Sequence, residues 1–396
     1  MKFVRSWEQL AMRYKLSQIA FFNPTETIKK GAIAKKVAMD KLLSFCRDIP
    51  SFELAEFNGG TKFRNGDTIM ARITPCLENG KTAKVSFLED GEIGFGSTEY
   101  IVFRAIEGIT DEDYLYYLVC SPTVRDIAIK SMVGSSGRQR VQTDVVKNIE
   151  VDLPPLDVQK KIGGLLKSLD DRIALNNKIN NNLLEQANAI FKREFLELSE
   201  LPDGWCRSNL TSIANYLNGL AMQKYRPADT EIGLPVLKIK ELRQGFCDSD
   251  SELCSPSIKS DYIINNGDVI FSWSGSLLVD FWCGGQCGLN QHLFKVTSDT
   301  YDPWFYFAWT NYHLAEFAHI AASKATTMGH IKRNDLEKAI VVSPSQEDYA
   351  RIGEILSPIY KAIVENRLEN NMLTQLRDTL LPQLISGELD ISTIEI

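Results

Sequence analysis

The chain has 396 residues, a formal net charge of −7 at pH 7, 44% hydrophobic residues and 24% charged residues. This length predicts two or more domains, and the composition is that of an ordinary globular chain. No stretch approaches the roughly 18–20 apolar residues of a membrane span, and Met1–Glu8 lacks the apolar core of a signal peptide, so we expect a cytoplasmic protein without membrane contacts.

The eight cysteines lack the spacing of a disulfide framework. They are Cys46, Cys76, Cys120, Cys206, Cys247, Cys254, Cys283 and Cys287. We expect reduced, mostly buried thiols, as in cytoplasmic proteins. Cys283, Cys287 and His292 come nearest to a metal-binding pattern, but no second close pair follows them, so we predict no metal site.

The first 153 residues predict a mixed head of strands and short helices. The Asn-Gly-Asp run at 65–67 predicts a tight turn that leads into a strand, and the alternating run Tyr100–Phe103 predicts a second strand. A short helix is expected near Asp113–Lys130. Pro154 and Pro155 then precede a long segment with apolar residues at helical spacing, which predicts a helix over 156–198.

The second half of the chain repeats this order. Leu210 and Ile213 keep the spacing of Leu16 and Ile19, and an Asn-Gly-Asp run returns at 266–268. A strand over 292–296, a short helix near 304–322 and a long helix over 346–386 complete the repeat. The second long helix follows Pro344, as the first follows Pro154.

The two long helices carry matching stripes whose members lie 190 residues apart. The first stripe is Ile162, Leu166, Leu169, Ile173, Asn176, Asn180, Leu183, Ala187 and Ile190, and the second is Ile352, Leu356, Ile359, Ile363, Asn366, Asn370, Leu373, Arg377 and Leu380. The spacing alternates between four and three residues, which is the pattern of a coiled coil. Two amphipathic helices in unrelated domains are the alternative, but the shared asparagines favour pairing.

Asparagine at a coiled-coil contact position costs stability but fixes the register, because mispairing would bury unmatched amides. Asn176, Asn180, Asn366 and Asn370 are therefore predicted to set the register of the helix pair. An antiparallel pairing would bring the central asparagines of the two helices together.

The repeat predicts an α+β fold in which two long antiparallel coiled-coil helices join two globular heads, with an approximate twofold relation between the halves. The predicted divisions are head one over 1–153, a central helix segment over 154–200, head two over 201–343 and a C-terminal helix segment over 344–396. Each helix is about 60 Å long at 1.5 Å per residue, which suits a spacer between heads.

Several segments resemble those of type I restriction–modification specificity subunits. They are Leu201–Trp205, Gly66–Pro75, Glu78–Lys81, Gly94–Glu99, Gly267–Ser272, Leu289–His292, the helix entries after Pro154 and Pro344, and Leu380–Leu389. No single motif is diagnostic, but their order and duplication cover essentially the whole chain. The resemblance implies that each head is a target-recognition domain that reads one half of a split, asymmetric DNA sequence.

The resemblance also implies the partners. The helix pair would dock two methyltransferase subunits, which carry S-adenosylmethionine and methylate adenine, and motor-nuclease restriction subunits would complete the complex. The specificity subunit itself would bind double-stranded DNA, hold no cofactor and have no catalytic residue.

The residues support a non-catalytic role independently. A P-loop with Gly-Lys-Ser/Thr is absent, so the chain is not expected to be a motor ATPase. Asn23-Pro24-Thr25 lacks the second proline and the aromatic residue of an amino-methyltransferase motif. Two copies of a binding head, moreover, suit two half-sites.

Candidate DNA contacts are basic or amide side chains in polar loops, because Lys and Arg hold phosphates and directional groups read base edges. In head one they are Lys29, Lys30, Lys35, Lys36, Arg72, Thr74, Lys81, Ser135, Ser136, Arg138, Gln139 and Arg140. In head two they are Gln223, Lys224, Tyr225, Arg226, Trp273, Ser274, Ser276, Lys324, Thr326, Thr327, His330, Lys332 and Arg333. For the four lysines at 29–36, a solvated face is the alternative interpretation.

The negative net charge of the chain favours an alternative function, binding to proteins instead of DNA. A net charge of −7 argues against a stand-alone DNA binder, since phosphate contacts need cations. This argument against DNA binding is weaker if partner subunits supply the nonspecific contacts with the phosphates. The rival hypothesis is a coiled-coil adaptor whose heads bind proteins and have no DNA specificity.

Overall fold

The computed structural model describes residues 11–323 and 330–391. The chain forms two compact units, one of Met1–Ala174 with Met372–Ile396 and one of Leu175–Asn371. Each unit holds one head and a stretch of both long helices. Within the described residues, no helix is long and apolar enough to cross a membrane. The four-segment division of the sequence stays a prediction.

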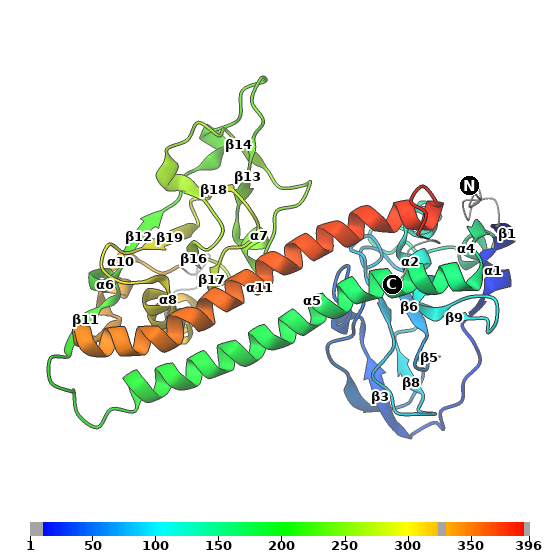
Figure 1. The fold of residues 1–396 in the computed structure, drawn as a ribbon, viewed down its shortest axis with the longest axis horizontal. Coiled ribbons are helices and arrows are strands. Elements are labelled where there is room, and N and C mark those ends of the chain that lie inside the picture. The colour runs from blue at the N-terminus through cyan, green and yellow to red at the C-terminus, as the bar shows by residue number, and fades with distance from the viewer. Residues whose placement is uncertain (1–10, 324–329, 392–396) are drawn as a thin grey trace, which may run out of the picture. The chain divides into compact units, whose positions relative to one another are not determined.

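The first unit contains head one (Figure 1). Its elements are β1 (Met12–Lys15), α1 (Leu16–Ile19), β2 (Ala20–Phe22), β3 (Ile33–Val37), β4 (Glu53–Glu56), β5 (Thr61–Phe63), β6 (Thr68–Ala71), β7 (Thr82–Lys84), β8 (Gly94–Gly96), β9 (Tyr100–Ala105), α2 (Glu112–Cys120), α3 (Pro122–Lys130), α4 (Thr143–Lys147) and β10 (Glu150–Leu153).

The second unit contains head two. Its elements are β11 (Cys206–Asn209), α6 (Leu210–Ile213), β12 (Asn215–Asn218), β13 (Leu234–Leu237), α7 (Ile239–Gln244), β14 (Leu253–Cys254), β15 (Ile263–Ile264), β16 (Val269–Ser272), β17 (Leu278–Phe281), β18 (Cys287–Leu289), β19 (Leu293–Thr297), α8 (Pro303–Tyr312), α9 (Leu314–Ser323), α10 (Arg333–Lys338) and β20 (Ile340–Ser343).

The two heads have the same sheet topology. Head one has a four-stranded sheet β2-β9-β6-β7, a second sheet β4-β3-β8-β5 and the pair β1-β10. Head two has β12-β19-β16-β17, β14-β13-β18-β15 and β11-β20 in the same order. The predicted α+β fold with a repeated head is therefore confirmed, and positions can be matched between the heads by strand register.

The central sheet of each head is buried on both faces. In β6, Ile69 packs into a cluster shared with the second sheet, whereas Met70 packs into a cluster shared with the helices. Successive side chains of a strand point to opposite faces, so both faces must be apolar and the strand is a continuous hydrophobic run. In β16, Ile270 and Phe271 divide between two clusters in the same way.

The Asn-Gly-Asp turns enter these central strands through matching polar contacts. Asp67 accepts from the backbone N–H of Arg64 at 2.8 Å, and Asp268 accepts from that of Asn265 at 2.8 Å. Each carboxylate also pairs with a cation of the neighbouring strand: Arg104 in head one, at 2.6 Å, and Lys295 in head two, at 2.9 Å. The turn is thereby anchored before the strand begins.

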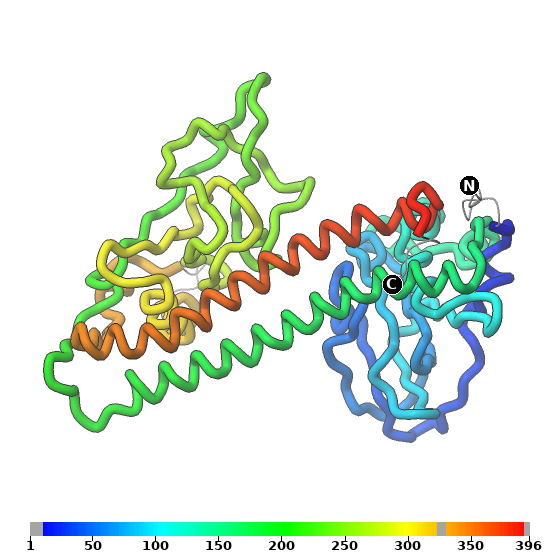
Figure 2. The backbone as a smooth tube through the Cα atoms, viewed as in Figure 1, coloured from blue at the N-terminus to red at the C-terminus, as the bar shows by residue number. Residues whose placement is uncertain are grey.

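The long helices are α5 (Leu156–Phe191) and α11 (Gln346–Ser386). Each one begins three residues after the end of the last strand of a head, and both are seen as long coils in Figure 2. The α11 bounds match the predicted helix. The α-helix α5 is shorter than the predicted span of 156–198, because it ends at Phe191 and one π-helical turn over Lys192–Leu196 follows it. Within each unit the two helices pair in opposite chain directions.

The single short helix expected in each head was wrong. The single helix expected near 113–130 is split into α2 and α3, because Pro122 lacks an N–H and holds Ser121 in an extended conformation. Its counterpart in head two is split at His313 into α8 and α9. The long helices are also more than spacers: Ile162 and Leu166 of α5 and Leu384 of α11 belong to the core of the first unit.

Candidate DNA interface

Two loops of head one that are distant in sequence lie side by side at the end of β6. The backbone N–H of Val141 donates to the carbonyl of Arg72 at 2.9 Å, and that of Thr74 donates to Gln139 at 3.0 Å. A bridge also joins Ile73 to Arg140. The loop after β6 and the polar loop before α4, both predicted to face DNA, therefore form one surface.

The second loop is a hairpin closed by two hydrogen bonds between Val133 and Arg140, of 3.0 and 2.9 Å. Its tip is a turn in which the N–H of Arg138 donates to Ser135 at 3.0 Å. Gly137 has a φ of +76°, which a residue with a Cβ adopts at a cost. Ser135, Ser136 and Arg138 are exposed at this tip, and Gln139 is half-buried.

Glu99 lies between two arginines at this surface. Its carboxylate accepts three hydrogen bonds of 2.7–3.0 Å from Nε and Nη2 of Arg140. Nε of Arg72 lies 3.8 Å from the same carboxylate. The hydrogen bonds from Arg140 hold the pKa of Glu99 below its usual value. Glu99 was not predicted from the sequence, since only the pairing of β6 with β9 places it beside Arg72.

The lysines predicted for head one do not form one group. Lys35 and Lys36 are neighbours on β3 and face opposite sides of the strand. Lys35 pairs with Glu92 at 2.8 Å, and Lys36 lies 3.9 Å from Glu53. Lys81 donates to the carbonyl of Met39 at 2.9 Å. Lys29 and Lys30 are exposed between β2 and β3, and their contact with DNA stays a prediction.

Head two builds the equivalent surface from different side chains. The N–H of Ile331 donates to the carbonyl of Trp273 at 2.9 Å, and a bridge joins Ser274 to His330. Nε1 of Trp273 donates to Asn218 at 3.0 Å, and the hydroxyl of Ser274 lies 3.2 Å from Nδ1 of His292. Ser276 is exposed in the same loop. The structure therefore brings Trp273, Ser274 and His330 together.

The remaining positions predicted in head two are more scattered. Lys332 and Arg333 are exposed at the start of α10. Gln223, Lys224 and Tyr225 are exposed on a separate loop next to β14, where Arg226 lies 3.4 Å from Glu252. Lys324, Thr326 and Thr327 lie outside the described residues.

The four asparagines predicted at the helix contact lie together. Asn176 donates to Asn370 at 2.9 Å, and Asn366 donates to Asn180 at 2.8 Å. Asn370 in turn donates to Asn177 at 2.9 Å. Asn176, Asn180 and Asn370 are buried. Their effect on register is a separate prediction that needs a measurement.

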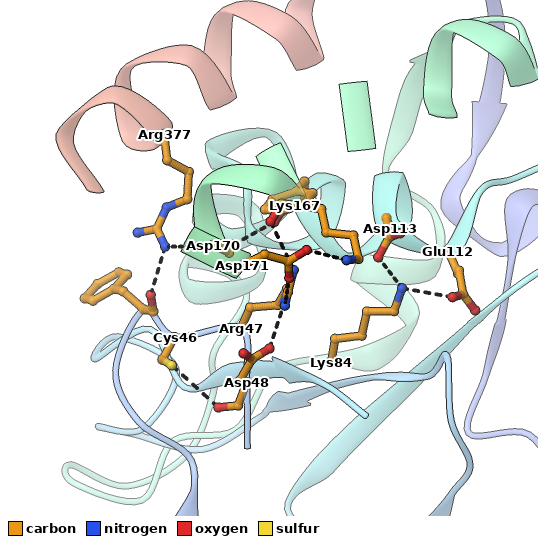
Figure 3. A network of polar contacts seen from close by, with 12 residues as sticks. Cys46, Arg47, Asp48, Lys84, Glu112, Asp113, Lys167, Asp170, Asp171 and Arg377 are labelled. Carbon is orange, nitrogen blue, oxygen red and sulfur yellow. Dashed lines mark hydrogen bonds and ion pairs between the residues drawn. The ribbon is translucent and has the colours of Figure 1, made fainter. Parts of the chain in front are cut away.

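The densest charged cluster in the first unit lies where α5, α11 and head one meet (Figure 3). Asp170 accepts from Arg377 at 2.6 Å and from the hydroxyl of Tyr117 at 2.6 Å. Asp171 pairs with Arg47 and with Lys167. Burial would raise the pKa of Asp171, but the hydrogen bonds from Lys167 and Arg47 outweigh it and hold the pKa below its usual value.

We call this cluster the clamp, because Arg377 of α11 and Arg47 of head one both bind carboxylates of α5, those of Asp170 and Asp171. Nearby, Nζ of Lys84 forms ion pairs with both Glu112, at 3.1 Å, and Asp113. Arg377 is the one charged residue in its predicted helix stripe, and a charge at a helix contact position is a sequence signal for a buried partner. Among the described residues, no group of three or more His, Cys, Asp or Glu side chains could hold a metal ion.

Comparisons with known proteins bear on this duplicated architecture. The model of the type I restriction modification DNA specificity domain matches residues 52–185 and 202–374, one stretch in each half. The type I restriction enzyme MjaIX specificity subunit of Methanocaldococcus jannaschii is 25% identical over 310 residues, which cover 73% of this chain and 71% of that protein. The EcoAI specificity subunit of Escherichia coli is 40% identical over 104 residues, which span 26% of this chain and only 18% of that protein.

Among solved structures, the type I restriction–modification S subunit from M. genitalium has the same fold. It superposes with a TM-score of 0.56 at 13% identity and covers 95% of this chain and 96% of that chain. Since the family model matches well over half of the residues, this chain belongs to the type I restriction modification DNA specificity domain family.

Proposed function

We propose that this chain is the specificity subunit of a type I restriction–modification complex, in which each head reads one half of a split DNA sequence. The observation that carries the proposal is the duplicated surface at the ends of β6 and β16. The backbone hydrogen bond from Val141 to Arg72 has its counterpart in that from Ile331 to Trp273, and both are 2.9 Å long. Two copies of one frame suit two half-sites.

The target is asymmetric in this proposal. Base edges are distinguished by the pattern of donors and acceptors that a protein presents to them. Head one presents guanidinium groups and a carboxylate, whereas head two presents indole and imidazole rings. Side chains this different would read different bases, so the two halves of the target would differ.

The chain is proposed to be a non-catalytic scaffold for its partners. Two methyltransferase subunits would dock on α5 and α11, bind S-adenosylmethionine and methylate adenine, and restriction subunits would join them in a cytoplasmic complex. The net charge of −7 supports a division of labour in which the partners supply much of the phosphate contact. The charged cluster around Asp170 supports a structural role for this part of α5 and α11, since its carboxylates are paired with cations.

The test is to express the chain with its cognate methyltransferase subunit in a host that lacks DNA methylation. Modified adenines are then mapped by single-molecule sequencing. A split, asymmetric motif that disappears when this chain is omitted is the expected result. A stable complex without any sequence-specific methylation would overturn the proposal and favour the protein-binding adaptor.

Mobility-shift assays separate the two hypotheses independently. The complex with its methyltransferase is titrated onto a duplex that carries the mapped motif and onto a scrambled duplex, at a stated salt concentration. The specificity hypothesis predicts tighter binding to the motif. Equal binding to both duplexes contradicts it.

A further inference from the structure

The two heads have equivalent positions at which their chemistry differs completely. In head one, Ala71 pairs with Tyr100, so Arg72 and Glu99 are the next residues beyond the paired strand ends. In head two, Ser272 pairs with Leu293, so Trp273 and His292 occupy these places. The third position belongs to the loop bridged to the strand end, where Arg140 in head one corresponds to His330 in head two.

The three side chains touch in both heads. In head one they form a chain of charges, because Glu99 binds Arg140 at 2.7 Å and lies 3.8 Å from Arg72. In head two they form an aromatic cluster, with ring centroids 6.0 Å apart for Trp273–His292 and 6.1 Å apart for Trp273–His330. A frame that is kept while its side chains change is what a variable reading surface requires.

Glu99 fixes the orientation of Arg140 and leaves part of the guanidinium open. Nε and Nη2 of Arg140 bind the carboxylate, whereas Nη1 has no hydrogen-bond partner among the described residues. The Arg140 side chain is 46% exposed. Nε of Arg72 is buried beside Glu99, but the Arg72 side chain is 31% exposed, and its guanidinium has no hydrogen-bond partner among the described residues. Donors thus remain at both arginines for a ligand.

The carboxylate also decides which part of DNA suits this surface. A phosphate beside Glu99 would meet a negative charge, so a simple phosphate contact is disfavoured here. A base edge is neutral, and guanine offers two acceptors, O6 and N7, that match two donors of one guanidinium. An arginine already held by a carboxylate loses little side-chain freedom when it binds such an edge.

We propose that Arg140 and Arg72 recognise guanine in the half-site of head one, and that Glu99 is the positioning residue that orients Arg140. This inference rests on the half-site function proposed above. By the same equivalence, Trp273, His292 and His330 form the reading surface of head two for the other half-site.

The test maps the methylated motif of complexes that carry Arg140→Ala, Arg140→Lys, Arg72→Gln or Glu99→Gln. Each arginine variant is expected to relax one guanine position in one half of the motif, with discrimination reduced roughly 10- to 100-fold. The other half should stay unchanged and serves as an internal control for folding. Arg140→Lys keeps the positive charge but loses the paired N–H donors of the guanidinium, so it should relax the same position as Arg140→Ala.

Glu99→Gln separates positioning from structural support. It should broaden the base preference at the Arg140 position while the complex still assembles with the methyltransferase. Arg13→Ala is the matched control, since Arg13 is an exposed arginine of the same head that lies 3.7 Å from Glu150. It should leave the motif intact.

Two results would overturn the inference. One is an unchanged motif in all four variants, and the other is a uniform loss of methylation at every site, which indicates phosphate contact. Either result is distinct from failure of the proposed function, in which the unmodified chain itself directs no split motif. Trp273→Ala and His330→Ala should alter only the opposite half of the motif.

Discussion

Asn176 on α5 donates a hydrogen bond of 2.9 Å to Asn370 on α11. In the internal repeat, Asn176 matches Asn366 and Asn180 matches Asn370. The equivalent bond is therefore the one from Asn366 to Asn180, which is 2.8 Å long. In these two bonds, each helix therefore gives one amide donor and one amide acceptor to the same antiparallel contact. A shift of one helix along the other would separate all four amides and leave the buried ones, Asn176, Asn180 and Asn370, without these partners, so these bonds can select one register.

The register role predicts that one asparagine substitution and the replacement of all four asparagines have opposite effects on stability. Asn370→Leu should destabilise the helix pair by about 1–3 kcal/mol, because it leaves buried amide groups without a partner. Replacing Asn176, Asn180, Asn366 and Asn370 together by Leu should restore or exceed the original stability and lose the unique register. Urea unfolding followed by helical circular dichroism measures the first effect. Asn182→Ala, at an exposed position of α5, is the control.

Cross-linking by engineered cysteines measures the register itself. Pairs placed for the observed register should form disulfides in the unmodified background. In the four-leucine variant, pairs shifted by one heptad should form as well. A four-leucine variant that keeps a single register would show that the apolar stripe is sufficient.

The clamp around Asp170 predicts a second asymmetry. Arg377→Met should cost about 3–5 kcal/mol, because it leaves the buried carboxylate of Asp170 with Tyr117 as its remaining partner. Asp170→Leu combined with Arg377→Met should recover most of this loss, since no buried charge is then left uncompensated. At the matching positions of the repeat, the second unit has Ala187 and Tyr360, so an uncharged contact is compatible with this helix pair. Chemical denaturation of single and double variants tests the coupling.

The Glu99–Arg140 contact should weaken in acid. The pKa of Glu99 is lowered in the folded chain, mainly by its hydrogen bonds with Arg140. A lowered pKa means that the contact stabilises the hairpin fully above the ordinary value of 4.5, and that this stabilisation is lost as pH falls through the lower folded value.

Hydrogen exchange of the amides at 133–140 provides the measurement. At pH 7, Glu99→Gln should exchange faster than the unmodified chain, and the ratio of the two rates should approach one well below pH 4.5. Glu107→Gln changes an exposed glutamate of the same head and should show no such difference at either pH. A rate ratio that is independent of pH would contradict the prediction.

The length of the helix pair should set the spacer between the half-sites. Duplicating residues 176–182 in α5 and 364–370 in α11 adds one heptad at facing positions and repeats the asparagine contacts. The insertion lengthens the pair by about 10 Å, which corresponds to about three base pairs of DNA. Mapping of methylated adenines should therefore show a longer spacer between unchanged half-sites.

The control for this experiment is an insertion in one helix only. It displaces the asparagines of α5 from those of α11, so assembly or methylation should be impaired without a defined new spacer. If the double insertion methylates the original motif with its original spacer, the helices do not act as the ruler.

The sequence by itself predicted the long helices, their pairing and the repeated head. These features follow from local signals: apolar spacing for the helices, proline before each helix start, and Gly387 with a φ of +83° just after α11. The Asn-Gly-Asp turns revealed the central strands for the same reason, since a turn and the strand after it are encoded by neighbouring residues.

Only the tertiary structure decided which polar side chains act together. Glu99 is separated from Arg140 by 41 residues, and their contact depends on a strand pairing and a loop bridge that no local pattern encodes. Lys35 and Lys36 look alike in sequence, but the alternation of a strand sends them to different acidic partners. Periodicity records which face of an element is buried, whereas the partners of a charged side chain depend on how separate elements pack, and that is fixed only when the chain folds.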